Sequence, residues 1–276
     1  MAKITTLKVQ EMKDKGEKIS MTTAYDYATA SVVDKAGIEI VLVGDSLMMT
    51  IMGESSTVPC TMEQMIHHIQ AVVAGAPNPL IVGDLPFGSY NVSKEQAIMN
   101  TNRMVKEGRC DVVKLEGGVE IAETVKAIVD SGTPVMGHIG LTPQTSAKMG
   151  GFKVQGKGEA AESVLEDALA IQEAGAFAIV LEGIPEALGT LITKKLDIPT
   201  IGIGGGRYTD GQVLVFHDML GFFDKFVPKF VKQYMQLNEE IVKALETYKA
   251  EVKSGAFPEE KHVFGGVTDE ELKRLY

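Results

Sequence analysis

The chain has 276 residues, 45% hydrophobic and 23% charged, which is the composition of an ordinary globular enzyme with one large core. Its net charge of −10, from 27 basic and 37 acidic residues, argues against nucleic acid or an anionic membrane as a partner. Cys60 and Cys110 have no paired spacing, so we expect no disulfide. The first residues lack an apolar signal core, and no stretch approaches the roughly 18–20 apolar residues of a membrane span. We therefore expect a cytoplasmic protein.

Short Val/Ile-rich runs alternate with helical patterns along almost the whole chain. Most of these runs lack polar alternation, as expected for a parallel sheet covered on both faces. The eight predicted strands span residues 19–23, 38–43, 80–83, 111–115, 134–138, 177–181, 199–203 and 212–217. Capping-box signals at Thr61/Gln64 and Ser93/Gln96 begin two of the helices between them. The pattern predicts an α/β protein, a (β/α)8 TIM barrel, as a single domain over residues 1–276. A doubly wound sheet is the alternative if the strands do not number eight.

The connections and the two ends carry further expectations. Residues 1–17 predict a short amphipathic helix that closes the bottom of the barrel. Residues 204–211 are too few for a crossover helix, and the glycines at 202–206 indicate a tight turn more than a phosphate site. Residues 140–158 contain five glycines and predict a mobile lid. A long helical pattern over residues 226–253 should pack on the barrel or on a neighbouring subunit.

Three acidic residues stand where predicted strands end: Asp45, Asp84 and Glu116. A carboxylate directly after an apolar β-run is costly to bury unless a cation or a partner meets it. The carboxyl ends of parallel strands converge, and Mg²⁺ is usually held by one or two carboxylates with waters and substrate. We therefore predict Asp45 and Asp84 as direct ligands, with Glu116 binding directly or through water. The other interpretation is that each acid caps a helix or pairs with a lysine. Zinc is disfavoured because no His-x-x-x-His or Cys-x-x-Cys pattern occurs.

Lys114 lies two residues before Glu116 on one strand, so both side chains point to the same face. Lys114 could hold a substrate carboxylate or simply neutralise the acids, and a Schiff-base role is redundant beside metal ligands. His138 and Glu182 end the fifth and sixth predicted strands, where either could act as a general base. A lone histidine at a strand end is more often a structural bridge. The same structural interpretation is favoured for the other histidines, which are His67 and His68 on a helix, His217 on the eighth strand and His262 in the tail.

Seven blocks, in order, resemble the ketopantoate hydroxymethyltransferase family, and the likeness runs from about residue 3 to 265. The blocks are Met-Thr-Thr-Ala-Tyr-Asp-Tyr (21–27), Val-Gly-Asp-Ser-Leu (43–47), Gly-Asp-Leu-Pro-Phe (83–87), Val-Lys-Leu-Glu-Gly-Gly (113–118), Gly-His-Ile-Gly-Leu-Thr-Pro-Gln (137–144), Leu-Glu (181–182) and Asp-Gly-Gln-Val-Leu-Val (210–215). Several such blocks in the right order are far more specific than any single motif.

The resemblance implies a decameric (β/α)8 barrel that uses Mg²⁺. It implies transfer of a hydroxymethyl group from 5,10-methylenetetrahydrofolate to 3-methyl-2-oxobutanoate, giving 2-dehydropantoate in pantothenate biosynthesis through a Mg-stabilised enolate. By position, the metal ligands of the family match Asp45, Asp84 and Glu116. The substrate contacts match Ser46 and Lys114, and Asp45 and Asp84 also border the substrate. The proton acceptor matches Glu182. His138 could contact the substrate or orient Glu182.

Two other functions fit a barrel with these acids. One is a Mg-dependent C–C lyase of the isocitrate lyase and PEP mutase type, whose members typically carry a Lys-Lys-Cys-Gly-His segment. Neither Cys60 nor Cys110 lies in such a context, which counts against it. The other is a catalytically silent scaffold, which predicts loss of the acids, yet all of them are present.

Overall fold

The computed structural model describes residues 2–223 and 225–276. Its parallel strands close into a barrel in which each strand pairs with the next along the chain and the last pairs with the first. The strands are β1 (Ile19–Thr23), β2 (Ile40–Val43), β3 (Leu80–Asp84), β4 (Val112–Glu116), β5 (Val135–Gly140), β6 (Ala178–Glu182), β7 (Thr200–Ile203) and β8 (Gly211–Leu214). The predicted (β/α)8 barrel is therefore confirmed, and the doubly wound sheet is excluded because the sheet has no open edge.

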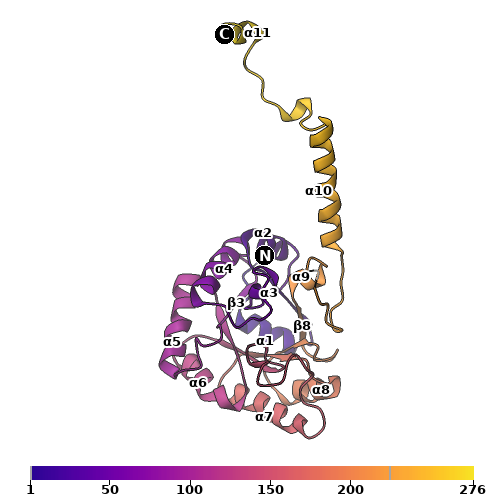
Figure 1. Cartoon of the computed structure of the whole chain (residues 1–276). Coiled ribbons are helices and arrows are strands. Elements are labelled where there is room, and N and C mark those ends of the chain that lie inside the picture. Colours follow the sequence, from indigo (N-terminus) through magenta and orange to yellow (C-terminus); the bar gives the residue numbers. More distant parts are fainter. Residues whose placement is uncertain (1, 224) are drawn as a thin grey trace.

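Helices surround the strands as an outer layer (Figure 1). They are α2 (Tyr27–Lys35), α3 (Leu47–Thr50), α4 (Met62–Gly75), α5 (Lys94–Arg103), α6 (Ala122–Asp130), α7 (Ala160–Glu173) and α8 (Glu186–Lys195). The capping box predicted at Thr61 is complete. At Ser93 only half of it forms, because the Gln96 side chain accepts from Val92 N instead of from the cap residue. A π-helical turn (Met104–Gly108) extends α5.

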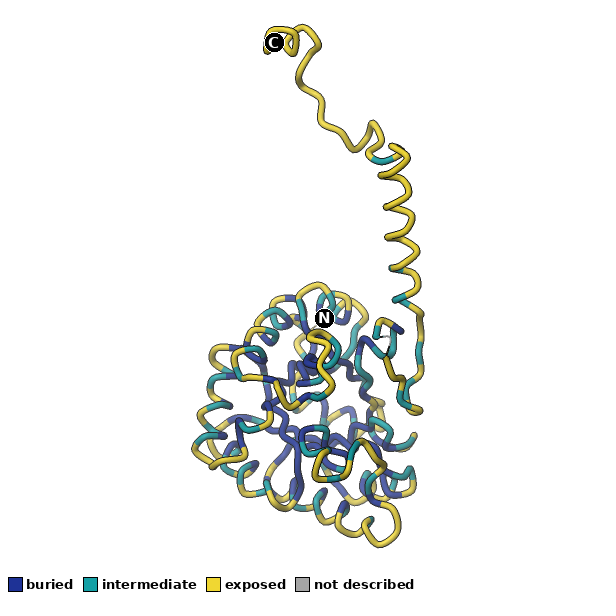
Figure 2. Tube along the Cα trace, in the orientation of Figure 1, coloured by how far each residue is buried: buried dark blue, intermediate teal, exposed yellow. Residues whose placement is uncertain are grey.

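Two apolar layers stabilise the barrel, one between the strands and the outer helices and one inside the barrel. The inner layer includes Val9 and Met12 of helix α1 (Thr6–Asp14), which lies across the amino-terminal ends of the strands. Lys13 anchors this helix through an ion pair of 2.8 Å with Asp210, just before β8. The predicted helix at the barrel bottom is thus confirmed. Figure 2 shows the buried strands inside a more exposed outer layer. Apolar side chains fill the lower part of the barrel interior, and the buried Asp84, Lys114, Glu116 and His138 lie at its carboxyl end.

The eighth strand is shorter than predicted, and His217 is not on it. Strand β8 ends at Leu214, and His217 lies in helix α9 (Phe216–Met219). The backbone N–H of Phe216 donates to Thr23 Oγ1 at 3.1 Å rather than continuing the ladder with β1, which turns the chain off the sheet. Residues 204–210, between β7 and β8, consist of bends without a crossover helix, as predicted.

The long C-terminal helix starts eleven residues later than predicted. Helix α10 spans Leu237–Ser254, and residues 226–236, which have helical spacing, are not helical. Pro228 disfavours a helix there. The N–H groups of Tyr234 and Leu237 donate to Met219 O and Leu220 O at the end of α9 instead of joining a helix of their own.

Helix α10 projects away from the barrel, followed by a 3-10 turn (Glu260–His262) and helix α11 (Asp269–Leu272) (Figure 1). Every residue of α10 is exposed or half-buried, so the expectation that it packs on its own barrel is wrong. Packing on a neighbouring subunit stays a prediction. Of the helices in the part of the chain that the structure describes, none combines the length and apolar character needed to cross a bilayer.

Candidate active site

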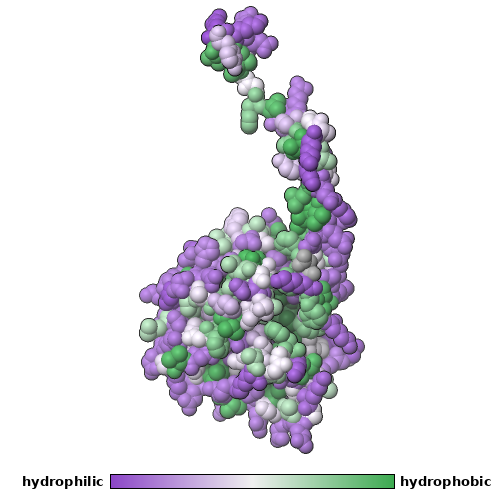
Figure 3. All heavy atoms as spheres, viewed as in Figure 1, coloured by the Kyte–Doolittle hydropathy of each residue, from purple (hydrophilic) through white to green (hydrophobic). Residues whose placement is uncertain are grey.

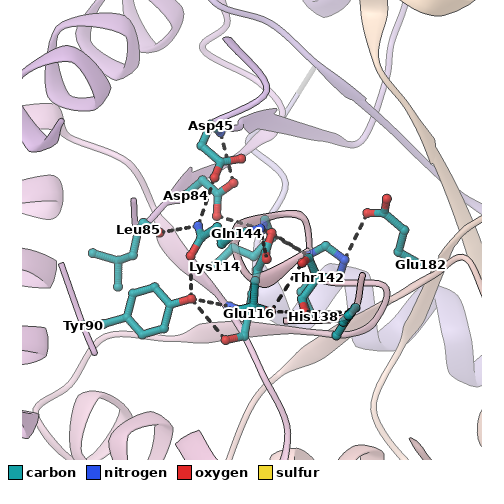
Figure 4. Close-up of polar contacts among 12 residues, drawn as sticks. Asp45, Asp84, Leu85, Tyr90, Lys114, Glu116, His138, Thr142, Gln144 and Glu182 are labelled. Carbon is teal, nitrogen blue, oxygen red and sulfur yellow. Dashed lines mark hydrogen bonds and ion pairs between the residues drawn. The ribbon is translucent and has the colours of Figure 1, made fainter. Parts of the chain in front are cut away.

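The predicted site residues meet at the carboxyl end of the barrel, on consecutive strands. Asp45 follows β2, while the other carboxylates are the last residues of β3, β4 and β6. The register places Asp84 opposite Lys114, and Glu116 opposite His138. Figure 4 shows that the side chains point toward one another. The structure therefore brings together Asp45, Asp84, Lys114, Glu116, His138 and Glu182, all of which are buried except for the half-buried Glu182.

Lys114 is the central cation of this group. Its Nζ lies 2.8 Å from Asp84 Oδ1, 3.7 Å from Glu116 Oε1 and 3.3 Å from His138 Nδ1. Burial alone would lower the pKa of Lys114, but the Asp84, Glu116 and Asp45 carboxylates together raise it above its ordinary value. The lysine is therefore charged, which suits it to bind an anion and does not suit it to act as an amine nucleophile.

His138 links two carboxylates. Its Nδ1 lies 3.4 Å from Glu116 Oε1, and its Nε2 lies 3.1 Å from Glu182 Oε2, within ion-pair distance but outside good hydrogen-bond alignment. Burial and the Lys114 charge lower the pKa of His138, and the contacts with Glu116 and Glu182 outweigh them and raise it to about 9. A protonated His138 can orient the Glu182 carboxylate.

Asp45 lies on the far side of Asp84 from Lys114. Its backbone N–H donates to Asp84 Oδ2 at 3.1 Å, and its Oδ2 accepts from Gln144 Nε2 at 3.0 Å. Burial raises the pKa of Asp45 well above its usual range, and the charges of Asp84 and Glu116 add to the effect. Burial also raises the pKa of Asp84, although Lys114 opposes it. The three strand-end carboxylates face only two cationic side chains, so a further positive charge would be needed to keep Asp45 ionised in this buried group.

A hard divalent cation would supply that charge. Glu116 is held by the protein itself, because its Oε1 faces Lys114 and His138 and its Oε2 accepts from Gln144 N at 2.9 Å. Within residues 2–223 and 225–276, no group of three or more His, Cys, Asp or Glu side chains is arranged to hold a metal ion. Mg²⁺ needs only one or two carboxylates with water and substrate oxygens. Asp45 and Asp84 supply two carboxylates side by side, and Asp84 Oδ1 has Lys114 at ion-pair distance but makes no aligned hydrogen bond among the described residues.

Ser46 follows Asp45 at the start of helix α3. Its hydroxyl lies 2.8 Å from the hydroxyl of Tyr25, which is buried between the barrel and α3. The Tyr25 contact thereby fixes the hydroxyl of the residue that directly follows Asp45.

Sequence reasoning missed Gln144 and Tyr90. Both are buried, and both contact the acids or their backbone. Gln144 ends the sequence block of residues 137–144, shortly after β5. Its position after a predicted strand could therefore have marked it as a candidate site residue. Tyr90 lies on the β3–α5 connection, seven residues from any predicted strand, and carried no signal.

The fold and the site define a class: a TIM-barrel enzyme with acid, lysine and histidine side chains gathered at the carboxyl ends of its strands, where such barrels carry their active sites. The sequence model of the family described as ketopantoate hydroxymethyltransferase matches residues 3–260, and the chain belongs to that family. The 3-methyl-2-oxobutanoate hydroxymethyltransferase of Heliobacterium modesticaldum is 59% identical over 275 residues, covering 99% of both chains. The enzyme of that name from Clostridium beijerinckii is 54% identical, covering 99% of this chain and 100% of its own.

Solved structures of the same fold are more distant in sequence. Phosphonopyruvate hydrolase in complex with oxalate and Mg++ has a TM-score of 0.60 at 12% identity, covering 100% of this chain and 95% of its own. 2,3-Dimethylmalate lyase, a member of the PEP mutase/isocitrate lyase superfamily, has a TM-score of 0.59 at 14% identity, covering 98% and 94%. At this identity the likeness shows the shared barrel fold alone.

Proposed function

We propose that the protein transfers a hydroxymethyl group from 5,10-methylenetetrahydrofolate to 3-methyl-2-oxobutanoate, giving 2-dehydropantoate for pantothenate biosynthesis. Full-length relatives with 59% and 54% identity carry the name of this activity. The observation that carries the proposal is the buried contact of Lys114 with Asp84, next to Asp45 and across from Glu182. This arrangement offers a cation site, an anion site and a proton acceptor at one end of the barrel.

The cation that we propose is Mg²⁺, held by Asp45 and Asp84, with Glu116 binding directly or through water. When bound, it would act as a Lewis acid that polarises the ketone of the 2-oxo acid. The adjacent carboxylates of Asp45 and Asp84 support this choice, and so does the raised pKa of Asp45, which a bound cation would lower. Phosphonopyruvate hydrolase, a barrel of the same fold, binds Mg++ together with oxalate, which is a small carboxylate ligand.

The protein side chains then have separate roles. Lys114, held charged by its neighbours, and the Ser46 hydroxyl would bind the substrate carboxylate and fix its orientation. Glu182 is the half-buried carboxylate of the site and would accept the proton from C3 of the substrate, while His138 holds its carboxylate in place. The carbanion formed at C3 attacks the methylene carbon, which folate presents as an iminium, so the C=N π electrons move to nitrogen as the C–C bond forms. Water supplies the hydroxyl group of the product, and tetrahydrofolate leaves.

A reconstituted reaction tests this function. The purified chain is incubated with Mg²⁺, 3-methyl-2-oxobutanoate and methylenetetrahydrofolate, and 2-dehydropantoate is followed by NMR. Glu182→Gln should lower kcat by about 10² to 10⁴-fold while leaving Mg²⁺ binding intact, because only the proton acceptor is lost. Asp84→Ala should abolish Mg²⁺-dependent turnover in a folded protein. Absence of product from the wild type, or unchanged Mg²⁺-dependent activity in Asp84→Ala, would contradict the proposal.

The C–C lyase alternative gains no support from the cysteines. Cys60 and Cys110 are both buried, and burial raises the pKa of each thiol to about 12. Neither thiol can serve as an acid–base group near neutral pH. Two free, unpaired thiols fit the reducing conditions of the cytoplasm, which we propose as the location.

We also propose that the chain forms a homo-oligomer, a decamer by resemblance to the family. Helix α10 carries Leu237, Ile241, Leu245, Tyr248 and Val252 on one face, although it projects from the barrel. Leu245 and Tyr248 are more than half exposed, and Figure 3 shows hydrophobic residues along this C-terminal segment. An apolar face that its own chain does not cover fits a second copy of the chain as its partner.

A further inference from the structure

Gln144 connects the loop after β5 to the acids of the site (Figure 4). It lies in a 3-10 turn (Pro143–Thr145) and is 3% exposed. Its Nε2 donates to Asp45 Oδ2 at 3.0 Å and to Leu85 O at 2.9 Å, and its backbone N–H donates to Glu116 Oε2 at 2.9 Å. One residue thus contacts a proposed direct ligand and the third acid at the same time.

Tyr90 fixes the orientation of this amide. Its buried hydroxyl lies 2.6 Å from Gln144 Oε1, to which it donates, and it accepts from Glu116 N at 3.3 Å. Because Leu85 O can only accept, the Gln144 NH₂ group must face Leu85 O and Asp45, which leaves Oε1 as the acceptor for the Tyr90 hydroxyl. All hydrogen-bonding groups of the Gln144 side chain are therefore used, and no rotated amide satisfies the same partners.

Backbone hydrogen bonds anchor the glycine-rich loop of residues 140–158 at both ends. Leu141 N donates to Glu182 O at 2.8 Å at its start, and Gln155 N donates to Gly183 O at 2.9 Å at its end. Between these anchors Lys148, Phe152, Lys153 and Val154 are exposed. The Gln144 side chain is thus the contact through which the position of the loop can affect the carboxylate of Asp45.

We propose that Gln144 is a positioning residue that couples the docking of this loop to cation binding at Asp45 and Asp84. The inference rests on the cation site of the proposed function. With the loop docked, Gln144 occupies Asp45 Oδ2 and directs the second oxygen of that carboxylate to the cation, while its backbone N–H holds Glu116 against Lys114 and His138. Hydrogen bonds to ligating carboxylates commonly change metal affinity by about 10- to 100-fold. Since coupling is reciprocal, cation binding must stabilise the docked loop by the same factor.

Gln144→Met tests the coupling, because methionine keeps the side-chain volume and removes both polar groups. The metal-free full chain is titrated calorimetrically with Mn²⁺, which accepts the same oxygen ligands as Mg²⁺. In parallel, trypsin cleavage at the exposed Lys148 and Lys153 is timed with and without saturating Mn²⁺. In the wild type Mn²⁺ should slow cleavage severalfold. Gln144→Met should weaken Mn²⁺ binding about tenfold or more and lose the protection by Mn²⁺.

Gln155→Met is the matched control, since it makes the same change in the same loop at a side chain that donates to Lys153 O and makes no contact with the acids among the described residues. It should keep wild-type Mn²⁺ affinity and protection. Tyr90→Phe, which removes the hydroxyl bound to Gln144, should shift both readouts in the same direction as Gln144→Met and serves if that variant does not fold. Wild-type affinity and protection in Gln144→Met, or in Tyr90→Phe in its place, would overturn the coupling alone. Failure of Mn²⁺ to bind the wild type would refute the cation site and the inference with it.

Discussion

Replacing Lys114 by methionine should strongly destabilise the metal-free protein. Lys114 Nζ lies 2.8 Å from Asp84 Oδ1 in a buried site that also contains Asp45 and Glu116. The substitution keeps the aliphatic stem and removes the charge, so the acids lose their central cation. Breaking a buried pair by removing one partner costs about 3–5 kcal/mol, a large part of the roughly 5–15 kcal/mol that stabilises a protein. With a urea m-value of about 3 kcal/mol/M, the unfolding midpoint should fall by about 1–2 M.

A double-mutant cycle with Asp84→Asn isolates the interaction. Asp84→Asn keeps the shape of the side chain and removes its charge, so Lys114→Met should cost much less in that background than in the wild type. Urea unfolding of the four proteins, followed by circular dichroism in chelator, gives the coupling energy. A Lys114→Met variant as stable as the wild type, or equal costs of this substitution in both backgrounds, would show that the buried acids are not held by this charge.

Two further predictions concern the segment after β8. Burial raises the pKa of Asp218 to about 6. Because this folded-state pKa exceeds the unfolded-state pKa, stability that is present at low pH is lost as pH rises through about 6. In thermal or urea unfolding, Asp218→Asn should therefore stabilise the protein by about 1–2 kcal/mol at pH 8, after allowance for solvent screening, and the difference should vanish toward pH 4. A stabilisation that is equal at both pH values would exclude this cause. In helix α10, Leu245→Asp should shift the chain to smaller species in analytical ultracentrifugation. Thr247→Asp adds the same charge on the side of the helix opposite Leu245 and should leave the mass unchanged. The same mass for the wild type and both variants would exclude the α10 face as an oligomer contact.

The strands were predictable because the barrel buries them on both faces. Runs such as Ile40–Val43 and residues 80–82 are apolar without alternation, and the errors lie within two or three residues at the strand ends. Asp84, Glu116 and Glu182 belong to the strands they were expected to follow, because each still pairs with a neighbouring strand. A charged residue ends an apolar run in the sequence. It does not end the hydrogen bonding between strands where the side chains that face the barrel interior form a polar site.

The C-terminal segment was not predictable from spacing because its partners are distant in sequence. Phe226, Phe230 and Tyr234 recur every four residues, which favours a helix. In the structure the Phe230 ring lies against Gly204 after β7, so close that a Cβ at residue 204 would lie 2.8 Å from it. The backbone around Tyr234 bonds to the end of α9. A tertiary contact with a glycine and a helix end thus replaces the local hydrogen bonds that the pattern implied.

The electrostatics of the site follow from the strand register, which the apolar pattern sets. Lys114 and Glu116 face the barrel interior because Val113 and Leu115, between and beside them, are buried under the outer helices. The same pattern on β3 and β5 fixes Asp84 opposite Lys114 and Glu116 opposite His138, so that each acid has a base on the next strand. A slip of one residue between β3 and β4 would turn Lys114 and Glu116 toward the helices and leave Asp84 without a cation. Apolar packing in the lower barrel therefore determines which charges meet above it. Asp45, which follows β2 rather than lying on it, has no such partner on a strand and depends instead on Gln144 from a loop.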